Sequence, residues 1–492
     1  MQKAVSFIRE NTKRHLDWAI DLCRIPSVST KPEHKADVAR AVQWTRDLCE
    51  KIGLKARIIE TARHPAVYAE RCDHPGRPVY LVYGHVDVQP TGDLALWDAG
   101  PFEPTLKDGW LVCRGSSDDK GQALLYLRAV EAWLKAEGRL PINLKLLIEG
   151  EEEIGSPNLG KLLEEHRDLL KCDTILISDT GMHEDGLPTI TLGTRGLVYK
   201  EVRLQGPKHD LHSGTHGGPA PNPATILAQL IASLHDPQTG RVTIPGFYEH
   251  VQDPTPEERR AYAALNLDPA RYAADLGVAA LAAGEKGWTP QEQRSIRPTL
   301  EVNGIFGGYM GEGANTIIPA RVGAKISMRL VPNQPAEEIS RAFDAHVHKT
   351  IEQLTKGRGA AAQTVKVEIV QHGPAVNAYI TPTGEAGARS PSRADSAADS
   401  HPASAATAQA FAAARRSLEE SFNHEVALVR EGGSLPILPM FKRVLGADSL
   451  MLGFASPSCN AHGPNEKVLL RDLDRGAEAI ARLFGHLGSL NT

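Results

Sequence analysis

The sequence predicts an α/β fold with a mostly parallel sheet and helices on both faces. Short apolar runs without a polar face, at residues 79–83, 142–148 and 174–178, are typical of strands that are buried on both sides. Segments in which apolar residues recur at helical spacing, including residues 4–22 and 34–53, alternate with these runs. Strands that alternate with helices form parallel sheets, because each crossover helix packs on a face of the sheet.

The pattern changes after Val198. Residues 321–330 alternate strictly between apolar and polar side chains, which is typical of a strand with one covered and one open face. A helical pattern near 339–354 and another alternating run near 365–369 follow, while residues 250–298 are charged, alanine-rich and helical in pattern. These features predict a smaller α+β domain, in which helices lie on an antiparallel sheet.

The first pattern returns late in the chain, so the smaller domain is predicted to interrupt the larger one. Residues 385–405 are rich in Ala, Ser, Pro and Gly, which predicts an irregular connection or an insertion. A chain of 492 residues is long enough for two or three domains. The predicted parts are the first section of the larger domain at 1–204, the smaller domain at 205–384 and the second section of the larger domain at 385–492.

Composition excludes several classes of function. The net charge of −5 and the pI near 6.5 leave no basic excess to hold phosphates, so we expect neither nucleic-acid nor membrane-surface binding. The start of the chain lacks the apolar segment of a signal peptide, and no apolar run is long enough to span a bilayer. The 6 cysteines have no CxxC spacing and are expected to be reduced thiols, so the sequence predicts a cytoplasmic protein.

Potential metal ligands stand directly after the three apolar runs. His85 and Asp87 follow the first run, a glutamate-rich stretch at 149–153 follows the second, and Asp179 follows the third. Two adjacent aspartates, at 118–119, open a helical segment. Taken singly, each group has an ordinary explanation as a loop pair, a helix N-cap or a solvated acidic run. Together, at the strand ends where α/β sheets place their sites, they predict a metal site.

A histidine in a late loop completes the candidate ligands, which are His85, Asp118, Glu152 or Glu153, Asp179 and His462. Imidazole together with carboxylate suits zinc, manganese or cobalt better than a thiolate site or an all-oxygen calcium site. The set is too large for one tetrahedral ion and fits two ions about 3.5–4 Å apart. A glutamate that is not used as a ligand could then serve as general base.

Six motifs stand in a fixed order along the chain: Gly84-His-Val-Asp-Val, Arg114-Gly-Ser-Ser-Asp-Asp-Lys-Gly, Glu149-Gly-Glu-Glu-Glu-Ile-Gly-Ser, Ser178-Asp179, Leu211-His-Ser-Gly and His462-Gly-Pro-Asn-Glu. With these motifs, from about residue 15 to 485, the chain resembles the M20 metallopeptidase family, and most of all its cytosolic dipeptidase and carnosine dipeptidase branch. The resemblance implies a di-metal α/β catalytic domain that is interrupted by a smaller lid domain, which also dimerises.

The resemblance also implies a ligand role for individual residues of this sequence. His85 and Asp179 would bind one ion. His462 and Glu153 would bind the other. Asp118, the first acid of its Asp-Asp-Lys-Gly motif, would bridge both ions.

Further roles follow from the same resemblance. Glu152 would be the general base, and Asp87 would orient the imidazole of His85. His212, in the Leu-His-Ser-Gly motif, would reach the active site of the partner subunit and stabilise the oxyanion. The closely spaced glutamates make the choice of base and ligand depend on the register of the motif.

Substrate-binding residues are expected in the later part of the chain. Arg329 and the pair Gly433-Ser434 resemble the groups that hold the C-terminal carboxylate of the substrate, although an arginine on the polar face of a strand is often only solvated. His372 resembles another substrate histidine of this branch, and an ordinary surface position explains it equally well. The sequence after His372, Pro374-Ala-Val-Asn-Ala, departs from the family pattern.

The sequence therefore predicts a cytoplasmic metallopeptidase that hydrolyses dipeptides or similar short peptides. It is expected to carry two divalent metal ions per subunit, zinc first with manganese or cobalt as alternatives, and to form a homodimer through the lid domain. One alternative is an N-acyl-amino-acid deacylase with the same metal centre. Another is a binding protein that kept the fold without catalysis, against which stands the competent chemistry of all the candidate ligands.

Overall fold

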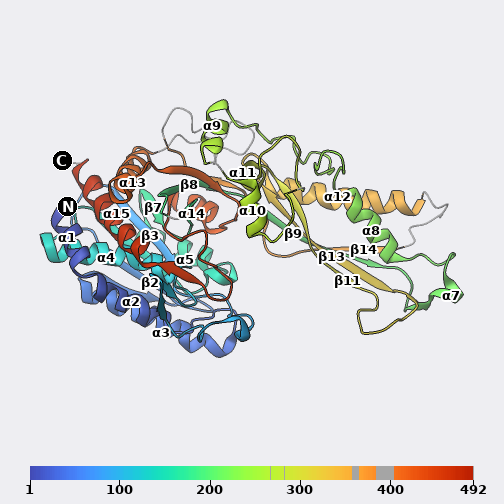
Figure 1. Cartoon of the computed structure of the whole chain (residues 1–492), viewed down its shortest axis with the longest axis horizontal. Coiled ribbons are helices and arrows are strands. Elements are labelled where there is room, and N and C mark those ends of the chain that lie inside the picture. Colours follow the sequence, from blue (N-terminus) through green and yellow to red (C-terminus); the bar gives the residue numbers. More distant parts are fainter. Residues whose placement is uncertain (185, 266, 282, 357–364, 384–403, 491–492) are drawn as a thin grey trace.

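The computed structural model describes the chain except for residues 185, 266, 282, 357–364, 384–403 and 491–492. The described residues form two parts, seen side by side in Figure 1. The part with both chain ends, called the body here, is built around a nine-stranded sheet. The elongated part, called the lid, is built around a four-stranded sheet and points away from the body.

The body sheet is parallel at its centre, where β6, β3, β7 and β17 lie side by side. Antiparallel strands flank this centre on both sides. The predicted mostly parallel sheet is thus confirmed, with antiparallel edges. The strands, in spatial order, are β1 (Lys55–Ile59), β2 (Ala66–Arg71), β6 (Asn143–Glu149), β3 (Val79–His85), β7 (Thr174–Ile177), β17 (Asp448–Gly453), β8 (Thr189–Thr194) and β15 (Tyr379–Ile380), with β16 (Ala427–Glu431) paired to β8.

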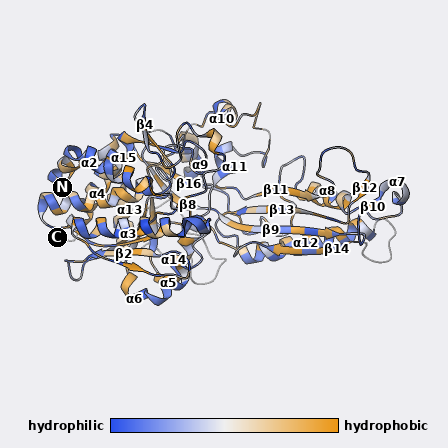
Figure 2. Cartoon of the chain, turned by 90° about the horizontal axis from the view of Figure 1, so that it is seen from below, coloured by the Kyte–Doolittle hydropathy of each residue, from blue (hydrophilic) through white to orange (hydrophobic). Residues whose placement is uncertain are grey.

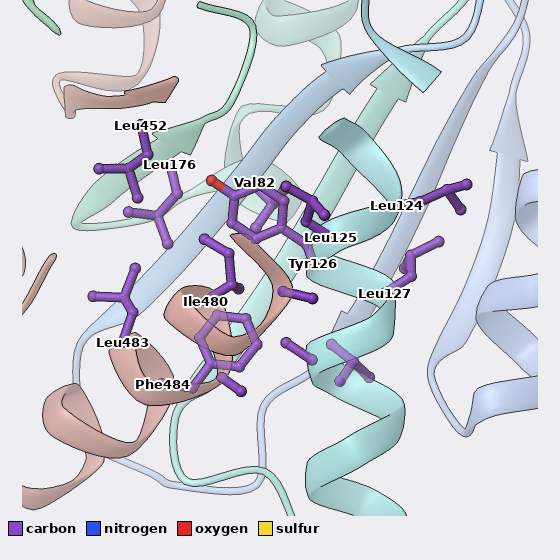
Figure 3. Packing of buried hydrophobic residues seen from close by; sticks show 14 of the residues in the cluster. Val82, Leu124, Leu125, Tyr126, Leu127, Leu176, Leu452, Ile480, Leu483 and Phe484 are labelled. Carbon is purple, nitrogen blue, oxygen red and sulfur yellow. The ribbon is translucent and has the colours of Figure 1, made fainter. Parts of the chain in front are cut away.

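Helices cover both faces of the body sheet, as the sequence predicts. One face carries α1 (Gln2–Glu10), α2 (Thr12–Cys23), α3 (Lys35–Ile52), α4 (Lys120–Glu137), α13 (Ala405–Phe422) and α15 (Leu470–Ser489). The other carries α5 (Leu159–Glu165), α6 (Arg167–Leu170) and α14 (Ile437–Leu445). Tyr80 and Val82 of β3 belong to the first core, whereas Leu81 and Tyr83 belong to the second, which explains the uninterrupted apolar run. Figure 3 shows Val82 among side chains of α4 and α15.

The helical pattern at residues 4–22 is divided into α1 and α2 in the structure. Asn11 separates the two helices, and its side-chain amide donates a hydrogen bond to the carbonyl oxygen of Phe7 at 2.8 Å. An asparagine that bonds to the preceding turn offers the backbone an alternative to continuing the helix. The apolar spacing alone does not reveal this break.

The lid is a helix-covered antiparallel sheet. Its strands are, in spatial order, β11 (Thr299–Gly307), β13 (Arg321–Leu330), β9 (Gly196–Gln205) and β14 (Lys366–Gln371). The helices α8 (Pro223–Ser233) and α12 (Ala336–Lys356) pack on one face. Ala324, Ile326 and Met328 of β13 are buried while Lys325 is exposed, so the predicted alternating strand is confirmed. The predicted boundary between residues 204 and 205 falls within β9.

Smaller elements complete the described chain. The charged segment predicted to be helical contains α9 (Pro256–Ala264), α10 (Pro269–Asp275) and α11 (Pro290–Ser295). A small sheet of β10 (Leu211–His212) and β12 (Ile317–Ile318) lies with α7 (Ser213–His216) at the tip of the lid, farthest from the body in Figure 2. A second small sheet contains β4 (Thr105–Lys107), β5 (Trp110–Val112) and β18 (Lys467–Leu469).

Most of the predicted irregular connection at residues 385–405 lies outside the described residues, and α13 begins at its end.

Within the described part of the chain, none of the helices is both long and apolar enough to cross a lipid bilayer.

Candidate metal centre

The candidate site lies where the four central strands of the body sheet end. Parallel strands end at the same edge, and α/β proteins place their sites there. His85 is the last residue of β3, and Asp179 follows β7. Glu152 and Glu153 follow β6 in a short 3-10 turn, η3 (Glu152–Ile154), and His462 lies on the loop after β17. The topology therefore brings together residues from distant parts of the chain.

Asp118, which comes just before α4, lies between the two histidines. Its Oδ1 is 3.2 Å from Nε2 of His85, and its Oδ2 is 2.9 Å from Nε2 of His462. Asp179 adds a carboxylate oxygen 3.8 Å from Nε2 of His85, and Glu153 adds one 3.3 Å from Nε2 of His462. Each histidine thus has one carboxylate of its own, and the two histidines share Asp118.

Two groups of side chains could each hold a metal ion. One consists of His85, Glu152 and Asp179, and the other of Asp118, Glu153 and His462. Within each group the possible ligand atoms lie within 4.8 Å of one another. His85 is fully buried, whereas the side chain of His462 is 57% exposed, so the centre opens to solvent on the side of His462.

The electrostatics of these groups fit a cation. Burial raises the pKa of Glu152 well above its usual range, and the charges of Asp179 and Glu153 add to this effect. Burial also raises the pKa of Asp179 to about 6. Nε2 of His85 is buried and makes no hydrogen bond within the described residues. Buried carboxylates gathered around two imidazole nitrogens favour a bound cation, and the donor set suits zinc, manganese or cobalt.

Asp87 organises this cluster without belonging to either group. Nδ1 of His85 is hydrogen-bonded to the carbonyl oxygen of Asp87 at 3.1 Å, which assigns the ring proton to Nδ1. The lone pair of Nε2 can then serve as a metal ligand. The Asp87 carboxylate accepts the backbone N–H groups of Glu152 and Glu153, at 3.2 and 3.0 Å. Gln89 also donates to Oε2 of Glu153 at 2.7 Å. The residues predicted as base, ligand and orienting acid therefore form one connected unit.

The glutamate-rich stretch divides into residues that face the centre and residues that hold the turn. Glu149 accepts a hydrogen bond from the Tyr83 hydroxyl at 2.5 Å, deep in the body. Glu151 is buried and accepts the backbone N–H of His64 at 2.7 Å. Only the next two glutamates reach the ligand groups in the described structure. The structure thus separates candidates that the sequence leaves to the register of the motif.

Glu466 is a functional candidate that the sequence analysis did not single out, although it ends one of the quoted motifs. Its buried carboxylate accepts the backbone N–H groups of Gly115, Ser117 and Asp118, at 3.0 to 3.1 Å. It also pairs with the buried guanidinium of Arg114 at 2.8 Å. These bonds hold the loop that presents Asp118, a role that depends on contacts across 348 residues of sequence.

The residues predicted to hold a substrate carboxylate lie together at the junction of body and lid. Nη1 of Arg329 donates to the hydroxyl of Ser434 at 2.7 Å, and that hydroxyl donates to the carbonyl oxygen of Gly196 at 3.1 Å. Gly433 precedes the serine in the same turn. Burial lowers the pKa of Arg329, and no carboxylate pairs with this guanidinium among the described residues. A half-buried cation without an acidic partner is suited to an anionic ligand.

Two predicted site histidines lie away from the metal cluster of the same chain. Nε2 of His372 contacts Oε2 of Glu201 at 2.9 Å, and its ring packs edge-on against Tyr199 with the centroids 5.6 Å apart. His212 lies on β10, which Figure 2 shows beside α7 at the tip of the lid. Its Nδ1 accepts the N–H of Gly214 at 3.0 Å.

Comparisons with known proteins agree with this geometry. Beta-Ala-His dipeptidase of Homo sapiens is 28% identical over 483 residues, which cover 94% of this chain and 88% of that protein. Cys-Gly metallodipeptidase dug1 of Schizosaccharomyces pombe (strain 972 / ATCC 24843) is 28% identical over 489 residues, covering 95% and 94%.

Solved structures show the same fold. An M20 family metallo-carboxypeptidase, Sso-CP2 from Sulfolobus solfataricus, is 30% identical with a TM-score of 0.81, covering 96% of this chain and 99% of that one. Human carnosine dipeptidase 1 is 26% identical with a TM-score of 0.79, covering 99% and 98%. The family described as Peptidase family M20/M25/M40 matches residues 81–486, so this chain belongs to that family.

Proposed function

We propose that this chain is a metal-dependent dipeptidase, which hydrolyses the amide bond of dipeptides or similar short peptides. The observation that carries the proposal is the position of Asp118 between His85 and His462, each of which has a further carboxylate beside it. The family is one of peptidases, and the two relatives above are named for the dipeptides Beta-Ala-His and Cys-Gly.

The centre would hold two divalent ions, zinc first and manganese or cobalt as alternatives. His85 and Asp179 would hold one ion, and His462 and Glu153 the other. Asp118 would contribute one oxygen to each, as its two oxygens face different histidines. When bound, the ions supply Lewis-acid polarisation of the scissile carbonyl and lower the pKa of water at the site.

Glu152 is the proposed general base and acid. Its backbone N–H is bound by Asp87, which fixes the residue beside His85 and Asp179. The carboxylate would take a proton from the attacking water and give it to the amine that leaves. Asp87 would act by orienting His85 and by holding the turn that carries Glu152.

Arg329, Ser434 and the backbone at Gly433 would hold the C-terminal carboxylate of the peptide. The hydrogen bond from Arg329 to the serine hydroxyl places the guanidinium beside the turn, and the planar fork of N–H donors suits a carboxylate. The Ser434 hydroxyl donates to Gly196 in this structure and would have to rotate to donate to the carboxylate as well. His372 is kept as a further substrate residue, held in place by Glu201.

His212 is proposed to act in the active site of a partner subunit, in a homodimer formed through the lid. Because its Nδ1 accepts backbone N–H groups, its proton lies on Nε2, which leaves Nε2–H as an exposed donor. A donor of this kind can stabilise the oxyanion that forms during hydrolysis. The position of His212 at the tip of the lid favours a role outside its own subunit.

The remaining predictions belong to the same proposal. The division at residues 1–204, 205–384 and 385–492 into catalytic domain, lid and second section of the catalytic domain is kept as a proposal, although β9 of the lid lies mostly before its first boundary and β15 of the body lies before its second. A cytoplasmic location is supported by the 6 cysteines, all of which are free thiols in the described chain. The N-acyl-amino-acid deacylase alternative is not favoured, because the relatives above are peptidases by name.

A substrate panel tests the proposal. The purified protein, loaded with zinc or manganese, is incubated with Cys-Gly, β-Ala-His, Ala-Leu and N-acetyl-leucine, and the released amino acids are quantified. We expect cleavage of dipeptides that is abolished by a chelator and restored by metal. Cleavage of the N-acetyl amino acid alone would support the deacylase, and no cleavage with metal bound would contradict both.

A further inference from the structure

We infer that Arg195 is a positioning and specificity-determining residue of the carboxylate subsite, where it holds the turn at Gly432–Ser434 and provides a second positive charge beside Arg329. Arg195 is the single residue between β8 of the body and β9 of the lid. This inference rests on the proposed dipeptidase function and adds to it a group that reads the free carboxylate end of the peptide.

Hydrogen bonds join Arg195 to the turn at two successive residues. Its Nε donates to the carbonyl oxygen of Gly432 at 2.8 Å, and its backbone N–H donates to that of Gly433 at 2.9 Å. The turn also contacts Gly196, the residue after Arg195, because the Ser434 hydroxyl donates to the Gly196 carbonyl oxygen. The position of the Ser434 hydroxyl, and through it that of Arg329, thus depends on Arg195.

The turn is closely packed at position 432. A Cβ built on Gly432 would lie 2.5 Å from the carbonyl oxygen of Arg294, which excludes a larger residue, and 3.3 Å from Nη2 of Arg195. The glycine therefore lets the turn lie against the Arg294 backbone, within hydrogen-bond reach of Arg195 across 237 residues of sequence.

The charges around Arg195 are of both signs, but no acidic group forms an ion pair with it among the described residues. Arg195 is partly buried, and burial together with the positive charge of Arg329 lowers its pKa to about 10, while the charges of Glu301 and Glu431 act in the opposite direction. In the described structure, Nη1 contacts neutral oxygens, the carbonyl of Arg297 and the hydroxyl of Thr299, both at 3.4 Å. Two neighbouring guanidinium groups that make no ion pair within the described chain can therefore take an anionic ligand.

The test compares a dipeptide with its own C-terminal amide, using the best dipeptide of the panel above. The wild type should cleave the free acid with a kcat/KM at least about 100-fold above that of the amide. Arg195→Met should lower kcat/KM for the acid by about 10- to 100-fold, mainly through KM, and change that for the amide by less than about 2-fold. Arg195→Lys keeps the charge and should recover part of the preference.

Arg321→Met is the matched control, because Arg321 is an exposed arginine at the other end of β13, and it should leave both substrates unchanged. Equal losses for acid and amide in Arg195→Met would mean a purely structural role and would overturn the inference, as would no change at all. If the wild type cleaves acid and amide equally well, the inference fails together with the proposed carboxylate subsite at Arg329 and Ser434, while the proposed metal-dependent dipeptidase activity stands. If it cleaves neither, the proposed function fails with it.

Discussion

The two main sheets, that of the body and that of the lid, differ in how completely they are covered. The body sheet is buried between two layers of helices, and every residue of β6 is buried. The lid sheet carries helices on one face, and along β11 buried and exposed residues mix, with Ile305 65% exposed. The body thus has the rigidity needed to fix ligand atoms, whereas the lid keeps surface available for contacts with other molecules.

The same contrast holds for the site residues. The buried carboxylates of Asp87 and Glu466 hold the backbone that presents the metal cluster, by accepting the N–H groups of Glu152, Glu153 and Asp118. His212 at the lid tip is exposed and is oriented only by its own turn in the described structure. We therefore assign the chemistry to the body and the recognition of transition state and partner to the lid. The predictions below test this division.

The largest effect is expected in the body, at Glu152. Glu152→Gln removes the proton acceptor and should lower kcat by about 10²- to 10⁴-fold while the metal content is unchanged. Glu151→Gln is the matched control, since Glu151 accepts the backbone N–H of His64 and should affect stability more than kcat. Measurements of kcat and of metal content on both variants distinguish loss of the base from loss of stability. Loss of an ion in Glu152→Gln would make this residue a ligand instead of the base.

Core substitutions should separate the stability of the two parts. Phe484 lies in the core of the body and Phe343 in that of the lid, both fully buried. Replacing either phenylalanine by alanine should lower the free energy of unfolding of the part that contains it by about 3–5 kcal/mol. Calorimetry combined with metal analysis should show weakened metal binding in Phe484→Ala and retained metal in Phe343→Ala. If both variants lose metal equally, body and lid do not behave as separate units.

His212→Ala should lower kcat by about 10²-fold without loss of metal, because it removes one oxyanion donor. The role across subunits has its own test. Mixing inactive Glu152→Gln with His212→Ala protomers should restore activity, since one of the two sites in a mixed dimer then contains both wild-type residues. Mixed protomers that stay as inactive as the separate variants would exclude the role across subunits.

The smallest effect concerns acid stability of the body. Burial raises the pKa of Glu131, but hydrogen bonds from His15 and Arg14 outweigh burial and bring its pKa to about 2, below its ordinary value of 4.5. A carboxylate with a lowered pKa stabilises the fold above about pH 4.5, and this contribution is lost as the pH falls toward about 2. The free energy of unfolding is measured by denaturation at pH 6 and at pH 3. The decrease between the two pH values should be about 1 kcal/mol smaller in Glu131→Gln than in wild type, allowing for screening. An unchanged pH dependence would argue against a stabilising carboxylate here.

Much of the fold follows from the sequence because burial imposes visible patterns. Strands covered on both faces read as continuous apolar runs, and the residue types of β13 alternate as expected for a strand with helices on one face, although Gly323 and Ser327 on its other side are also buried. The interruption of the helical pattern at Asn11 was not predicted, since apolar spacing continues across it. Local hydrogen bonding decided that break.

For the candidate site, residues at strand ends were predictable and supporting residues were not. His85 and Asp179 stand where apolar strands end, a position that the sequence reveals. Glu466 and Arg195 act through contacts with residues hundreds of positions away, which no local pattern encodes. The roles assigned to individual site residues remain predictions until they are tested by substitution.

Metal content per chain, measured together with dipeptide cleavage, tests the central claim most directly. After reconstitution with zinc, the wild type should bind about two ions per chain and cleave a dipeptide, and a chelator should abolish the cleavage. His462→Ala should retain about one ion, because His85 and Asp179 remain to hold it. A wild-type protein that binds no metal, or that cleaves dipeptides as rapidly in excess chelator with its metal removed, would contradict the account.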